Sequence, residues 1–207
     1  MSRSTIILLK TLTWIACLAP AAWLVYGAIV NNLGPDPTAN LAFTTGLVTL
    51  RLLAITLAIS PIRKLIPQLN WLIRFRRLLG LFAFFYATLH MLTWVALYSG
   101  FDLHAMLIDV TRRRFIMAGA AAYLLLLPLA LTSTNWAIRK MGGKNWSRLH
   151  KLIYLAAICG VIHYWWQVKT GVLTPLDMTI LFTVLLLARP VIAFARRRKS
   201  PSPIRLG

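Results

Sequence analysis

The stretch LLGLFAFFYATLHMLTWVALYS (78–99) decides the fold of this protein. It is apolar over about twenty residues, which is the length of helix needed to cross the hydrocarbon core of a bilayer. Similar blocks recur along the chain, and 59% of its 207 residues are hydrophobic, while only four are acidic and none is glutamate. A soluble domain could not cover so much apolar surface with polar side chains. The sequence therefore predicts an all-α integral membrane protein.

The apolar blocks predict a bundle of about six transmembrane helices. Arg3 and Lys10 precede the first block, as in a signal peptide, but the block continues without a small-residue cleavage site, so we expect a retained helix. We see no internal repeat, and we expect one membrane domain over 1–195 followed by a basic cytoplasmic tail, 196–207. The expected spans are 8–30, 42–60, 78–99, 115–133, 149–167 and 177–195.

The net charge of +19 arises from 23 Lys and Arg residues, most of which lie between the apolar blocks. There they can contact anionic lipid headgroups of the bilayer, so the charge does not indicate nucleic-acid binding. Bases concentrate at the N-terminus, in the second and fourth loops and in the tail; the third loop, with 112–114, is the exception. Basic loops stay on the cytoplasmic side. The pattern predicts that both termini are cytoplasmic.

Two histidines are the strongest candidates for a cofactor site. Expected spans three and five cross the bilayer in the same direction, and His90 lies about 18 Å and His163 about 21 Å along them from Leu78 and Leu149. Two imidazoles at matched depth on parallel helices could bind one heme iron from opposite faces. The alternative is that each histidine only hydrogen-bonds a neighbouring helix. His104 lies in the third loop and belongs to no such pair.

The inner end of the same two helices is asymmetric. His150 precedes His163 by the same spacing at which Arg77 precedes His90, so one histidine and one arginine stand where a second bis-histidine site would need two histidines. Arg77 could bind a heme propionate or a flavin phosphate with its guanidinium fork. The alternative is that it anchors a loop at the headgroups.

Arg51 lies near the middle of the expected second span. It is too deep to reach the headgroups easily, so it requires an anionic partner or a wet cavity. A cofactor carboxylate or a quinone carbonyl is a plausible partner. The chain has no GxGxxG, Walker or HExxH motif and is too short for an added flavin or nicotinamide domain. Electrons must therefore arrive through a partner or through quinol.

Five segments of the sequence resemble the heme-binding membrane subunit of the periplasmic methionine-sulfoxide reductase system (the MsrQ, or YedZ, family), which lies within the ferric-reductase-like transmembrane superfamily. The blocks RRLLGL…ATLH and WxxLHKxxY…IHY carry most of the resemblance. The matching segments are LGPDP (33–37), SPIRK (60–64), IRFRRLLGLFAFFYATLH (73–90), the segment 129–169 and the basic tail.

This resemblance implies a bacterial inner-membrane protein that binds heme b and associates with FMN. It implies His90, His150 and His163 as the histidines of the site, and a periplasmic molybdopterin-containing methionine-sulfoxide reductase catalytic subunit as the partner. The electrons would come from the quinone pool or a cytosolic flavin reductase. The larger superfamily places two histidines on each of two helices, so Arg77 leaves a second heme in doubt.

We expect an electron-transfer subunit that supports repair of oxidised periplasmic proteins and does not itself reduce the final substrate. A second hypothesis is a self-contained ferric or quinone-linked transmembrane reductase, which would work without a periplasmic partner. A third is a scaffold or transporter whose histidines only pack, which predicts a colourless protein.

Overall fold

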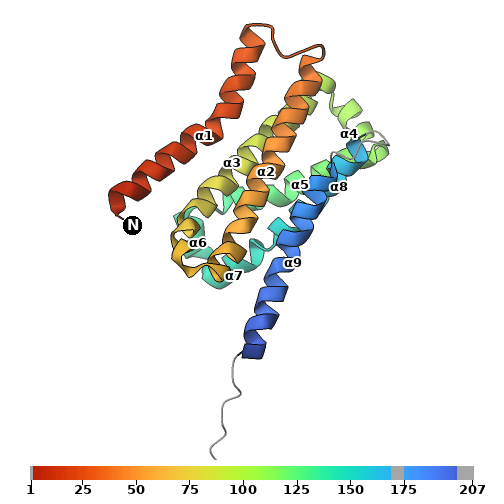
Figure 1. Ribbon diagram of the computed structural model, residues 1–207. Helices are drawn as coiled ribbons and strands as arrows, with labels where there is room; N and C mark the ends of the chain where they lie inside the picture. Colours follow the sequence, from red (N-terminus) through yellow and green to blue (C-terminus); the bar gives the residue numbers. More distant parts are fainter. Residues whose placement is uncertain (1, 169–174, 200–207) are drawn as a thin grey trace, which may run out of the picture.

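The computed structural model describes residues 2–168 and 175–199, and every regular element in them is helical (Figure 1), which confirms the all-α prediction. The long elements are joined by short helical turns rather than by extended loops. The elements are α1 (Arg3–Ile29), α2 (Pro37–Leu65), the 3₁₀ helix η1 (Pro67–Leu72), α3 (Ile73–Thr93), the π-helix η2 (Trp94–Tyr98), α4 (Leu103–Arg112), α5 (Arg114–Leu131), α6 (Asn135–Met141), α7 (Gly143–Leu149), α8 (Leu152–Gln167) and α9 (Pro175–Lys199).

Five helical stretches of the described chain are long and apolar enough to cross a membrane: 3–29, 37–65, 67–98, 114–131 and 175–192. Five of the six expected spans are therefore present. The remaining one, 149–167, forms α8, whose 16 residues measure about 24 Å along the axis. That is shorter than the hydrocarbon core of about 30 Å. The chain bends at His150 and Lys151, between α7 and α8, which shortens this helix.

Two helical hairpins form the centre of the bundle. The helix α2 packs along α3, and α5 packs along α8, while α9 covers the side formed by α2 and α8. A continuous cluster of buried side chains joins these helices, including Leu53 and Leu57 of α2, Tyr86 of α3 and Ala157 of α8. Helix α1 makes few contacts and exposes many of its large apolar side chains, as expected for a helix that faces lipid.

Tyr86 of α3 forms the hydrogen bonds that join α1 to the bundle. Pro20 interrupts α1, and the fully buried Tyr86 inserts its hydroxyl at this break. The hydroxyl donates to the carbonyl of Cys17 at 2.6 Å and accepts from the amide of Ala21 at 3.0 Å. Because a side chain in the hydrogen-bond ladder of a helix bends it, these contacts account for the curvature of α1 (Figure 1).

The expected loops contain more helix than the sequence suggested. Helix α2 continues through Pro61 to Leu65, and the segment 67–72 is a 3₁₀ helix, so little of the expected loop 61–77 is irregular. Asp102 begins α4 by accepting hydrogen bonds from the amides of residues 104 and 105. Helix α9 runs to Lys199, past the expected start of the tail; 200–207 and most of the expected fifth loop lie outside the described residues.

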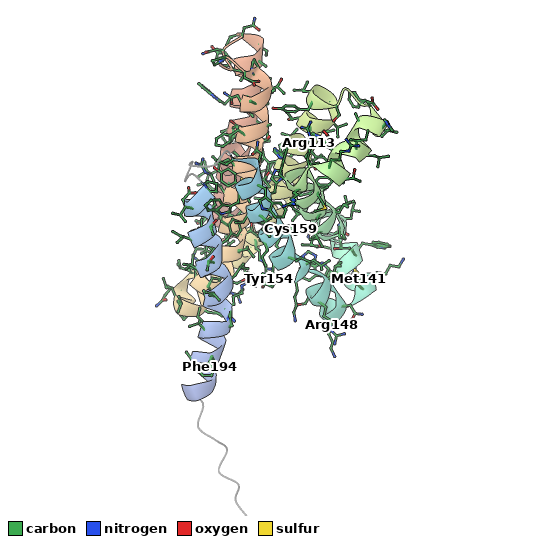
Figure 2. The ribbon with its side chains drawn as sticks, turned by 90° about the vertical axis from the view of Figure 1, so that its right-hand side faces the viewer. Arg113, Met141, Arg148, Tyr154, Cys159 and Phe194 are labelled. Carbon is green, nitrogen blue, oxygen red and sulfur yellow. The ribbon has the colours of Figure 1, made fainter. Side chains whose placement is uncertain are left out.

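Charge divides the two ends of the bundle. All four carboxylates lie at the end that carries α4: Asp36 before α2, Asp102 and Asp109 at α4, and Asp177 in the first turn of α9. The opposite end carries α6, α7 and the C-terminal end of α9 (Figure 1) and is rich in bases. Figure 2 shows these two ends, with Arg113 at the α4 end and Arg148 at the other.

Candidate functional site

His90 lies on α3 and reaches across to α2. Its Nδ1 atom is 2.8 Å from the carbonyl oxygen of Ala42, one turn before Gly46. A Cβ atom at Gly46 would lie 3.1 Å from both Nδ1 and Cε1 of the imidazole. Residues i and i+4 share a helix face, so the missing side chain at Gly46 opens the carbonyl of Ala42 to the ring. The lack of a Cβ atom at Gly46 therefore eases this close approach.

His163 on α8 makes the equivalent contact with α5. Its Nδ1 atom is 2.6 Å from the carbonyl oxygen of Phe115. A Cβ atom at Gly119, again one turn later, would lie only 2.7 Å from Nδ1 and 3.0 Å from Cε1. The Phe115 ring also lies beside the imidazole, with centroids 6.1 Å apart. This histidine is therefore held more tightly than His90.

The two imidazoles meet between the hairpins. Their centroids are 5.7 Å apart and their planes are nearly perpendicular, at 81°. A carbonyl oxygen can only accept a hydrogen bond, so Nδ1 carries the proton in each ring and Nε2 keeps its lone pair. A hydrogen bond from Nδ1 to a backbone carbonyl is the usual way in which a protein orients a metal-binding imidazole. Both half-buried rings thus have one nitrogen anchored and the other able to bind a metal.

The two halves of the site are built on one spacing. Each histidine follows the residue whose carbonyl it binds by 48 positions. Each also follows its glycine at one fixed interval, from Gly46 to His90 and from Gly119 to His163. The hairpins α2–α3 and α5–α8 therefore present their histidines in the same way, although the sequence shows no repeat of residue identities. Matching geometry in both hairpins explains why the rings reach the same depth.

His150 does not join this pair. It ends α7, where its ring packs on Trp146 with centroids 3.9 Å apart, and its Nε2 atom is 3.3 Å from the hydroxyl of Thr132. Burial, followed by the charge of Arg76, lowers the pKa of this imidazole below its usual value, which favours the neutral ring. Across the described residues, no group of three or more His, Cys, Asp or Glu side chains gathers to hold a metal ion.

The two arginines predicted from the sequence lie away from the histidine pair. Arg77 is exposed and donates from Nη1 to the side-chain oxygen of Asn135 at 2.7 Å, at the start of α6. Arg51 is exposed on α2 and lines a groove of about 280 Å³ between α2 and α9, together with apolar side chains that include Ala54 and Leu181. Within the part of the chain that the structure describes, Arg51 has no hydrogen-bond or ion-pair partner.

Comparisons with known proteins agree with this architecture. The family "Ferric reductase like transmembrane component" matches residues 45–161, from α2 into α8; this range includes His90 and ends two residues before His163. A "Protein-methionine-sulfoxide reductase heme-binding subunit MsrQ" from Herminiimonas arsenicoxydans is 44% identical over 195 residues, covering 93% of this chain and 89% of the relative. This chain belongs to the MsrQ family.

Other MsrQ proteins show the same level of similarity. The one from Ralstonia nicotianae is 44% identical over 158 residues, covering 76% of this chain and 72% of its own length. The one from Brucella anthropi is 43% identical over 183 residues, covering 88% and 82%. The resemblance inferred from the sequence blocks is thus confirmed.

Sequence reasoning missed several residues of the candidate site. The carbonyls of Ala42 and Phe115 carry no side-chain signal. Gly46 and Gly119 could have been found from their identical spacing to the two histidines. A different omission is Arg189, an ionisable residue inside the last expected span, where the cost of a buried charge should have drawn attention to it.

Proposed function

We propose that this chain is a heme-binding electron-transfer subunit, in which His90 and His163 would hold a b-type heme. The observation that carries the proposal is the anchoring of both rings through Nδ1, which leaves two Nε2 atoms available between the hairpins. The printed name of the MsrQ relatives, a heme-binding subunit, supports the same cofactor.

The two histidines fit a bis-imidazole site. Metal–imidazole bonds are about 2 Å long, so two Nε2 atoms on opposite sides of one metal ion lie about 4 Å apart and the ring centroids about 6 Å apart. The observed separation of the centroids, 5.7 Å, is close to this distance. A bound heme supplies a one-electron carrier. The chain would hold both rings and fix their tautomer through the hydrogen bonds made by Nδ1.

The other residues predicted to contact a cofactor lie at the base-rich end of the bundle and in the groove between α2 and α9. His150 and Arg77 stay predicted contacts of an inner cofactor, for which FMN is the candidate. Arg51 stays a predicted partner for a quinone carbonyl or a cofactor carboxylate, and the apolar groove in which it lies supports a quinone. An arginine that faces lipid in mid-span without a protein anion gains most from such a ligand.

We further propose the direction and the partner of electron transfer. The bases at one end of the bundle and the acids at the other favour cytoplasmic termini in a bacterial inner membrane, with one membrane domain over 1–195. The histidine pair then lies in the outer half. Electrons enter from the quinone pool or a cytosolic flavin reductase and leave to a periplasmic molybdopterin-containing methionine-sulfoxide reductase. The word "subunit" in the relatives' name supports such a catalytic partner.

A self-contained ferric or quinone-linked reductase is the second candidate, favoured by the ferric-reductase family match. The two candidates differ in what reoxidises the protein. The purified protein, reduced under anaerobic conditions, should be reoxidised by methionine sulfoxide only when the molybdopterin-containing partner is added. Reoxidation by a ferric chelate alone at a comparable rate, with no effect of the partner, would favour the second candidate instead.

A further inference from the structure

A half-buried cationic cluster lies at the base-rich end of the bundle, away from the histidine pair. Its central member is Arg189 of α9, which is half-buried and turned towards α2 and α8. Its Nη2 atom makes a long hydrogen bond of 3.4 Å to the carbonyl of Leu57, and its guanidinium carbon lies 4.9 Å from the centroid of the Tyr154 ring. The Nε atom is buried and has no partner among the described residues.

The second member is Arg76 of α3, which is half-buried next to the buried Phe75. Its charge acts on both Arg189 and His150, and the charge of Arg63 in α2 acts on Arg76 itself. Basic groups from four parts of the fold therefore converge on one region. Arg76 and Arg77 are neighbours in sequence, but Arg77 turns outward to Asn135, so Arg76 is the member that faces this region.

No aspartate lies at this end of the bundle, and the chain has no glutamate. The chain has four acidic residues, and all of them lie at the α4 end. The ion pair found in the described residues, Arg113–Asp109 at 2.9 Å, also lies there. Like charges in a region of low dielectric repel strongly, and an unpaired buried charge is costly. The arrangement becomes favourable when an anion occupies the region between the two guanidinium groups.

We propose that Arg76 and Arg189 form a binding site for an oxyanion, the phosphate monoester or the carboxylate of a bound molecule. The Nε and Nη2 atoms of Arg189 form one edge of the guanidinium, and this edge carries no strong protein hydrogen bond. Such an edge matches two oxygens of a phosphate or carboxylate. The site does not require a heme at His90 and His163. That the oxyanion belongs to a flavin or a heme, rather than to a lipid headgroup, rests on the proposed function.

The test uses inorganic phosphate and the purified full-length protein. Phosphate should raise the thermal midpoint above that seen in chloride of equal ionic strength. Arg76→Gln and Arg189→Gln should each weaken phosphate binding about tenfold or more, because each removes charge-assisted hydrogen bonds. Arg74→Gln is the matched control, since Arg74 is exposed on the same turn of α3. The phosphate response of the unmutated protein remains decisive if a variant does not fold.

The source of the oxyanion follows from what each variant loses. A loss of FMN per polypeptide in Arg76→Gln and Arg189→Gln identifies a flavin phosphate, a loss of heme a heme carboxylate, and a loss of copurified phospholipid a headgroup. The reduced heme spectrum of the histidine pair reports the proposed function separately. The proposal is overturned if phosphate stabilises the unmutated protein no more than chloride does, or if Arg74→Gln weakens binding as much as the other two variants.

Discussion

Gly119 and Gly46 give a graded steric test of the histidine site. A Cβ atom at Gly119 would lie 2.7 Å from Nδ1 of His163, whereas ordinary contact begins at 3.4 Å, so the ring must retreat by about 0.7 Å. The equivalent distance at Gly46 is 3.1 Å, which requires His90 to retreat by only about 0.3 Å. Metal ligands tolerate displacements of about 0.2 Å. The first change exceeds that tolerance severalfold and the second only slightly.

The retreat of His163 also weakens its anchor. The hydrogen bond to the carbonyl of Phe115, now 2.6 Å, would lengthen beyond the usual range, at a cost of about 1 kcal/mol. We therefore expect Gly119→Ala to lose most of its bound heme, and Gly46→Ala to keep its heme with a shifted reduction potential. The measurements are heme per polypeptide, the reduced-minus-oxidised visible spectrum and a redox titration.

Gly80→Ala is the matched control for this pair. Gly80 also lies inside a helix of the bundle, but a Cβ atom there would meet only Thr56 Cγ2, at 3.8 Å. It should leave heme content and potential unchanged. The reasoning is refuted if Gly119→Ala binds heme with the spectrum of the unmutated protein, or if Gly80→Ala loses as much heme as Gly119→Ala.

Two further predictions concern α1 and the groove between α2 and α9. Tyr86→Phe removes the hydroxyl that contacts both Cys17 and Ala21. Thermal unfolding in detergent should therefore show a loss of about 1–3 kcal/mol of stability, with an unchanged heme spectrum. An unaltered thermal midpoint would contradict this role of Tyr86. Arg51→Leu should slow reduction of the heme by quinol about tenfold and leave reduction by dithionite unchanged. Equal rates of reduction by quinol in this variant and in the unmutated protein would show that Arg51 is not part of a quinone site.

The sequence predicted the helical membrane bundle because an apolar run long enough to cross a bilayer can satisfy its backbone hydrogen bonds there in few ways other than a helix. It also predicted that His90 and His163 reach similar depths, since depth follows from rise per residue alone. It did not predict that α8 is short, because the bend at His150 depends on the ring packing against Trp146 and on the hydrogen bond to Thr132. The hydrogen bond to Thr132 joins segments that are separate in sequence.

The arginines show a second limit of sequence reasoning. The spacing from His90 points to position 77, but spacing gives height along a helix and not the direction of a side chain. In the structure Arg77 is exposed and donates to Asn135, whereas its neighbour Arg76 is half-buried. The carbonyl anchors at Ala42 and Phe115 were also invisible, because backbone atoms leave no trace in residue identity. Gly46 and Gly119, which expose these carbonyls, are the part of each anchor that can be recognised in the sequence.

The most direct test of the central claim is the visible spectrum and heme content of purified His90→Ala and His163→Ala, each compared with His104→Ala. His104 is exposed in α4 and serves as the control. The account predicts sharp reduced bands in the unmutated protein and in His104→Ala, and loss of most of these bands in each of the other two variants. A colourless unmutated protein, or unchanged spectra in both His90→Ala and His163→Ala, would contradict it.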